Sequence, residues 1–181
     1  AQGDAQAHAT VNNQVTVGAD TTLVGEGAVS LLAGQDRDFW RNKSFITARA
    51  DLFNHAAVPV SVNPDADAKL TLNNNVTVLG DEVRSGGTIQ VGGIEGTYVV
   101  QGRGKVSDWT RDVGELIGIS SEYGSSVKVL NADTSLNGVL EAGYGNKQII
   151  VIQPNGQLDT SKTQGNIRYT ITTEDLAATG V

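Results

Sequence analysis

The chain lacks two residue types altogether, since its 181 residues include no cysteine and no methionine. The absence of cysteine excludes disulfides, thiolate nucleophiles and Cys-ligated metals. Because translation starts with methionine, a chain numbered from Ala1 without any Met predicts processing at its N-terminus. The Ala-Gln start and the polar composition, rich in Asn, Thr and Gly, favour export by signal-peptide cleavage over simple Met excision.

Long hydrophobic runs and basic clusters are also missing. The longest apolar run, Ile149 to Ile152, is far shorter than the roughly 20 residues of a membrane-spanning helix, so we expect no membrane insertion. The net charge is −7, and lysines and arginines do not cluster, so we expect no phosphate-binding face and no nucleic-acid partner.

Glycine is abundant and proline rare, at 22 and 3 residues. With many Thr, Val and Asn, this composition predicts an all-β protein, and the length suits one domain. The spacing of about 10 to 12 predicted strands is typical of a β-sandwich of the jelly-roll or immunoglobulin-like kind. At most one short helix is expected, over residues 112–119.

The segment Ser44 to Val62 has the clearest strand pattern in the chain. Ile46, Ala48, Ala50 and Leu52 alternate with polar residues, as in a half-buried strand. After the break at residues 54–56, three valines alternate again, which predicts a second strand with Pro59 at an edge or a bulge. We expect this segment to form a central β-hairpin laid on the core.

Four further hairpins are predicted from glycine-containing turns between apolar runs. They are centred on residues 25–27, 92–96, 136–138 and 154–156. The closing strand is expected around residues 167–171, where Ile and Tyr alternate with Arg and Thr. No internal repeats or linkers are expected.

The N-terminal segment, residues 7–19, alternates small apolar residues with polar ones and predicts a strand with one apolar face. A terminal strand can stay in its own sheet or leave it and add to the sheet of a neighbouring subunit. We therefore expect residues 1–19 to act as a donor strand and residues 20–181 to form a single β-sandwich domain. The residues expected at this subunit interface are Ala7, Ala9, Val11, Asn13, Val15, Val17 and Ala19.

Side chains suited to catalysis are few. His8 falls on the polar face of the first predicted strand and His55 in a turn, so neither is expected to be catalytic, and we predict that the chain is not an enzyme and needs no cofactor. Asp65 and Asp67 offer two carboxylates for Ca²⁺, but Lys69 occupies the next ligand position of a calcium loop. No metal site is therefore expected.

Two tryptophans are the only candidates for a sugar-binding platform, because aromatic residues make up 5% of the chain. Trp40 and Trp109 are flanked by Arg41 and Arg111, and anchoring an interface explains them equally well.

The pattern from Ile46 to Val62 is an apolar strand, an Asn at its end, a short turn and alternating valines. It resembles secreted β-sandwich fibre proteins, namely the biofilm-fibre subunits of the TasA type and the archaeal bundling pili. This resemblance implies a subunit that polymerises by lending a strand to its neighbour, and it implies no catalytic residue.

The first functional hypothesis is therefore a secreted structural subunit of an extracellular filament, such as a pilus or biofilm-matrix fibre. Its partner would be itself, joined head to tail by donor-strand exchange. Two alternatives stay open: a virion coat or decoration protein, and a carbohydrate-binding or enzymatic β-domain.

Overall fold

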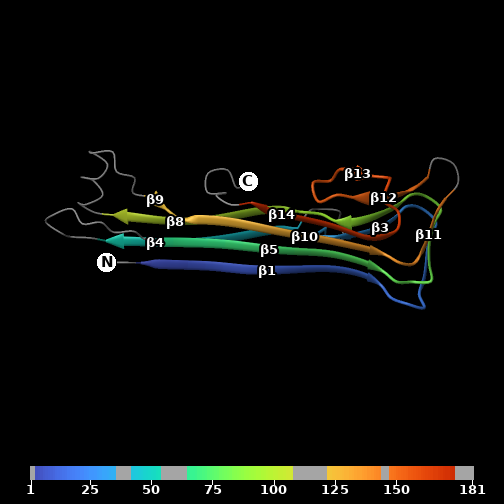
Figure 1. Ribbon diagram of the computed structural model, residues 1–181, viewed down its shortest axis with the longest axis horizontal. Helices are drawn as coiled ribbons and strands as arrows, with labels where there is room; N and C mark the ends of the chain where they lie inside the picture. The colour runs from blue at the N-terminus through green and yellow to red at the C-terminus, as the bar shows by residue number, and fades with distance from the viewer. Residues whose placement is uncertain (1–2, 36–41, 54–64, 108–121, 144–146, 174–181) are drawn as a thin grey trace.

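The computed structural model describes residues 3–35, 42–53, 65–107, 122–143 and 147–173 (Figure 1). These residues form β-strands joined by turns, and they include no helix. The expected helix over 112–119 and the second strand of the expected central hairpin both fall in segments that the structure does not describe.

The strands follow one another in circuits, each of which we call a coil. The first coil contains β1 (Asp4–Val17), β2 (Thr22–Gly25), β3 (Val29–Ala33) and β4 (Lys43–Phe53). The second contains β5 (Asp65–Val78), β6 (Glu82–Ser85), β7 (Ile89–Gly93) and β8 (Thr97–Ser107). The third contains β9 (Glu122–Tyr123), β10 (Ser125–Leu136), β11 (Val139–Ala142) and β12 (Ile149–Ile152), and it is followed by β13 (Leu158–Asp159) and β14 (Gly165–Thr173).

Each coil stacks on the previous one. Sheet A has the order β1-β5-β10-β14, sheet B β2-β6-β11, sheet C β3-β7-β12-β13 and sheet D β4-β8-β9. All pairs between equivalent strands of successive coils are parallel, whereas β9, β13 and β14 each pair antiparallel with a strand of their sheet. This arrangement is that of a β-solenoid, in which neighbouring coils supply one another's hydrogen bonds and core.

The sheets enclose two apolar cores. Sheet A packs along its length against sheets C and D, and Figure 1 shows its long strands β1, β5 and β10 running along the long axis of the molecule. Where sheet A meets sheets B and C, the core contains large side chains such as Val76, Val83 and Ile89. Where it meets sheet D, the core contains mostly alanine and leucine, including Ala48, Ala66 and Leu70. The expected all-β fold with packed sheets is confirmed.

Small residues bring sheets A and D into close contact. A Cβ placed on Gly102 of β8 would lie 2.1 Å from the carbonyl oxygen of Ser125 and 2.2 Å from that of Ala66. The backbone N–H of Gly102 donates to the Ser126 hydroxyl at 2.9 Å. The alanine-rich alternation in the sequence therefore produces a thin layer in which one backbone lies directly against another.

Most of the expected hairpins are wrong, because strands that follow one another belong to different sheets. β2 pairs with β6 rather than β3, β7 pairs with β3 and β12 rather than β8, and β11 pairs with β6 rather than β10. β4 has the expected inward alternation at Ile46, Ala48 and Ala50, and its described partner is the parallel strand β8, whereas the expected second strand of the central hairpin lies outside the described residues.

One hairpin prediction is confirmed. β12 and β13 pair antiparallel across the turn that contains Gly156, whose φ is 86°. The Gln153 N–H donates to the Gln157 carbonyl at 2.9 Å, which closes the turn.

The expectation that the chain has no internal repeat is also wrong. β1 and β5 pair in parallel at a constant offset, and nine of their fourteen paired positions carry the same residue. The match spans Asp4/Asp65 to Val17/Val78 and includes two consecutive asparagines. The repeat is masked in the sequence because the loops between equivalent strands differ in length.

Candidate functional site

The candidate site is the edge of β1 that faces away from β5, which we call the open edge. Within the part of the chain that the structure describes, β1 pairs only with β5. The carbonyls of Gly3 and Val17 accept hydrogen bonds from Asp65 and Leu79 respectively, so odd-numbered residues turn their peptide groups toward β5. Because peptide groups alternate along a strand, even-numbered residues turn theirs toward the open edge.

The structure places the expected donor-strand residues on one face of β1. Ala7, Ala9, Val11, Asn13, Val15 and Val17 all occupy inward positions, in agreement with the predicted alternation. Ala19 does not join them, because β1 ends at Val17 and Ala19 is exposed in the following turn, where Asp20 has a φ of 57°.

The inward side chains of β1 are incompletely covered. Ala9 and Val11 are only partly buried, whereas their partners on β5, Leu70 and Leu72, are 0% and 3% exposed. The difference arises because β5 has a neighbouring strand on each side, whereas β1 has only one neighbour among the described strands. The apolar side chains of the first coil are therefore only partly covered along the open edge.

Asparagine side chains form two ladders across the coils. In the outer ladder, the Asn73 amide donates to Asn12 Oδ1 at 2.7 Å and the Asn131 amide donates to Asn73 Oδ1 at 2.9 Å. In the inner ladder, the Asn13 amide donates to Asn74 Oδ1 at 2.7 Å. Such ladders form when identical residues stack in register, and they fix the register of the coils.

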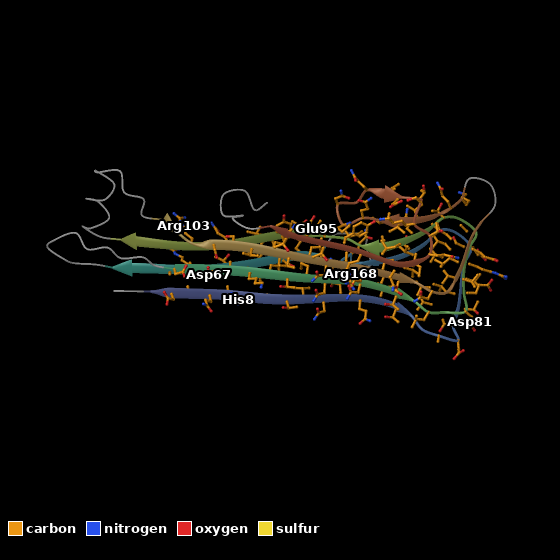
Figure 2. The ribbon with its side chains drawn as sticks, in the orientation of Figure 1. His8, Asp67, Asp81, Glu95, Arg103 and Arg168 are labelled. Atoms are coloured by element: carbon orange, nitrogen blue, oxygen red, sulfur yellow. The ribbon has the colours of Figure 1, made fainter. Side chains whose placement is uncertain are left out.

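Among the described residues, β1 itself carries none of the sequence devices that usually prevent an edge strand from pairing with other molecules. Edge strands are commonly protected by proline, lysine or inward-pointing charges. β1 contains no proline, lysine or arginine, and its one Asp or Glu is Asp4 at the first position. His8 lies on the exposed face of β1 (Figure 2). Nothing in β1 itself therefore opposes the addition of another strand.

Other candidate sites receive little support. Trp40, Trp109 and His55 fall outside the described residues. Asp65 is exposed at the start of β5, and Asp67 accepts a hydrogen bond from the Ser125 hydroxyl. Among the residues described, no three His, Asp or Glu side chains are grouped to hold a metal ion, and no helix is long and apolar enough to cross a membrane.

A groove of about 770 Å³ lies over sheet B and the start of β12. It is lined in part by Arg84, Glu141 and Lys147, and Arg84 Nε pairs with Glu141 Oε2 at 3.1 Å. This ion pair is exposed at both side chains, so it contributes little to stability.

Two groups that lie away from the open edge have shifted pKa values. Burial shifts one of them and hydrogen bonding the other. Desolvation lowers the pKa of Lys128, which is buried on β10 of sheet A with its Nζ over the Tyr98 ring of sheet D. The hydrogen bonds from Ser161, first from its hydroxyl and then from its N–H, lower the pKa of Asp159, and Lys162 contributes less. Neither group has a partner arrangement typical of acid–base catalysis.

The sequence interpretation missed the ladder residues Asn12, Asn73 and Asn131. The internal repeat could have identified these residues. Asn12 and Asn73, like Asn13 and Asn74, are separated by the same number of residues as the paired valines around them. Comparison with known proteins gave no match to a family model, to a curated protein sequence or to a solved structure.

Proposed function

We propose that the chain is a structural subunit of an extracellular filament and that copies of it associate through the ends of their coil stacks. The observation that carries the proposal is the open edge of β1, with its unprotected peptide groups and its partly exposed apolar face. An uncovered solenoid end normally needs a cap to stay soluble. Pairing with another subunit supplies that cap.

The composition supports a role outside the cell. The chain has no cysteine, a net charge of −7 and many Asn, Thr and Gly residues, and these features suit an exported structural protein. The asparagine ladders add to this argument, because stacked amides stabilise long in-register assemblies of strands.

Donor-strand exchange stays a prediction, and it would require β1 to give up its interactions with β5. β1 pairs with β5 over fourteen positions, and Asn12 and Asn13 both hydrogen-bond to β5 side chains. Exchange would first break this ladder, whereas pairing through the open edge keeps it. Edge pairing is therefore the arrangement that we propose.

Negative-stain microscopy of the purified chain tests the proposal, with filaments as the expected result. Icosahedral particles would favour a coat protein, and a monodisperse monomer at micromolar concentration would contradict self-assembly.

A proline variant tests the edge itself. Thr10→Pro removes an N–H that faces the open edge, so the backbone hydrogen bonds between β1 and β5 are kept. Because the open edge loses a donor, assembly should fall at least tenfold. Thr10→Ala, which keeps the N–H, should assemble normally. Ala9→Pro removes an N–H that faces β5, so this variant should lower the melting temperature instead.

A further inference from the structure

β14 is the last strand that the structure describes, and it lies at the opposite end of sheet A from β1. It pairs antiparallel with β10 over Gly165 to Thr173, and its other edge pairs with no described strand. Its side chains alternate in the same sense as those of β1: Ile167 is buried, whereas Arg168 and Thr170 are exposed. Ile171, on the inward parity, is 39% exposed.

The columns that run through sheet A define how a second copy would fit. Asn12, Asn73, Asn131 and Thr170 are successive members of one outward column. Val11, Leu72, Leu130 and Ile171 are successive members of an inward column. If the next copy continues these columns, its Asn12 follows Thr170 and its Val11 follows Ile171.

We propose that β14 of one copy pairs antiparallel with β1 of the next, with Thr170 opposite Asn12. This joint rests on the proposed self-assembly and specifies its partner, direction and register. Every inward residue of β14 then meets an inward residue of β1, so Ile167 and Ile171 cover Val15 and Val11.

Charge and symmetry both suit this joint. Between residues 9 and 17, β1 carries no charged side chain, and the charged residue of β14 is Arg168, whose Nε already bonds Asp133 at 2.9 Å. No like charges therefore meet. Because the two surfaces differ, the contact is heterologous and repeats in one direction, which builds an open filament. Pairing of β1 with β1 would instead give a closed dimer.

Single cysteines test the register without background, because the chain has none of its own. In one chain, residues 12 and 170 are separated by β5 and β10, roughly 14 Å across three strand spacings, which exceeds the reach of a disulfide. An Asn12→Cys chain mixed with a Thr170→Cys chain and oxidised should therefore give a mixed disulfide dimer. The double variant should give a ladder of multimers.

Other pairs of single-cysteine variants distinguish the proposed joint from other arrangements of two copies. Asn166→Cys lies four residues from Thr170, roughly 13 Å along the strand, and should not link to Asn12→Cys. A link between Asn12→Cys and Asn73→Cys in separate chains would show strand donation, and a link of Asn12→Cys to itself would show head-to-head pairing. Either result, or linkage at Asn166, would overturn the proposed joint.

The joint and the proposed function fail in different ways. Filaments of the unmodified chain in which no cysteine pair links would leave self-assembly standing and reject the β1–β14 joint. A chain that stays monomeric would reject both, and the open edge would then be covered by something other than a second copy.

Discussion

The side-chain amide of Asn13 on β1 donates to Oδ1 of Asn74 on β5 at 2.7 Å, inside the layer between the sheets. Asn74 is 1% exposed, and its own amide donates to the Ile94 carbonyl at 2.6 Å. Asn13 in turn accepts a hydrogen bond from the Asn42 amide at 3.1 Å. This connected set of polar groups links the first two coils and the loops that follow β3 and β7.

Asn74→Ala should lower the free energy of unfolding by about 1–3 kcal/mol, because it leaves the partly buried Asn13 amide and the Ile94 carbonyl without their partner. Asn73→Ala is the matched control, since Asn73 belongs to the outer, partly exposed ladder and water can replace its bonds. Urea unfolding of both variants measures the difference. Equal losses would mean that the inner ladder has no special structural role.

Gly102→Ala should be among the most destabilising single substitutions in the chain. The added Cβ would lie within 2.2 Å of two carbonyl oxygens, so sheets A and D would have to move apart, at an expected cost above about 4 kcal/mol. Gly27→Ala is the control, because no atom lies within 4 Å of the position that its Cβ would take. Thermal unfolding should separate the two variants clearly, and a stable Gly102→Ala chain would disprove the close packing.

Gly156→Val tests the one confirmed hairpin. A β-branched residue at a φ of 86° should cost about 1–3 kcal/mol, because this backbone region is strained for all residues but glycine and, to a lesser degree, Asn and Asp. Gly156→Asn should therefore cost less than Gly156→Val. An unchanged melting curve for both variants would show that β12 and β13 contribute little to stability.

Alternation allowed the strands to be predicted, but it could not identify their partners. The inward parity of β1 and of Ile46, Ala48 and Ala50 in β4 follows directly from the sequence. Pairing is different, because a glycine turn between two apolar runs suits both a hairpin and a corner between two sheets. The turn at Gly156 forms a hairpin, whereas the turn that contains Gly27 sends the chain into another sheet.

The stacking could have been found from the repeat, but only where the repeat is strong. β1 and β5 share nine of fourteen paired residues, whereas β10 keeps mainly the burial pattern, with Leu130 and Asn131 matching Leu72 and Asn73. The inward positions require only a suitable size and polarity, so the sequence can drift while the fold is kept. The open edge of β1 could not be predicted, since it depends on which strands become neighbours.

The pKa of Asp159 provides a local test of the turn after β13. The Ser161 hydroxyl donates to Asp159 Oδ1 at 2.6 Å and the Ser161 N–H donates to the same oxygen at 2.9 Å. Ser161→Ala removes the larger cause of the lowered pKa, so the pKa should rise toward its usual range without reaching it. Lys162→Met should raise the pKa less. Carboxyl NMR titration measures both shifts.

The sign of the pH effect at Asp159 follows from the lowered pKa. The folded chain releases this proton more readily than the unfolded chain, so the stabilisation is present above the unfolded-state pKa and is lost as the pH falls through the lowered value. Ser161→Ala should weaken this acid-side dependence. An unchanged titration of Asp159 would show that the turn adopts another conformation in solution.

The buried ion pair of Lys128 and Glu95 supplies the last prediction. Lys128 is 4% exposed and Glu95 20%, and the lysine Nζ lies 4.1 Å from the centre of the Tyr98 ring. Removing one partner of a buried pair leaves the other charge uncompensated, so Glu95→Ala should cost roughly 3 kcal/mol. Lys128→Met keeps the volume and leaves a carboxylate that water can reach, so it should change stability by less than about 1 kcal/mol.

The pH dependence of stability tests the burial of Lys128 separately from its ion pair with Glu95. Burial lowers the pKa of Lys128 below its ordinary value, so the unfolded chain binds this proton more tightly than the folded chain does. Stability should therefore rise with pH between the lowered pKa and the ordinary one, and Lys128→Met should remove that rise. If Lys128→Met and the unmodified chain show the same alkaline profile, Lys128 is not held in a desolvated position between the sheets.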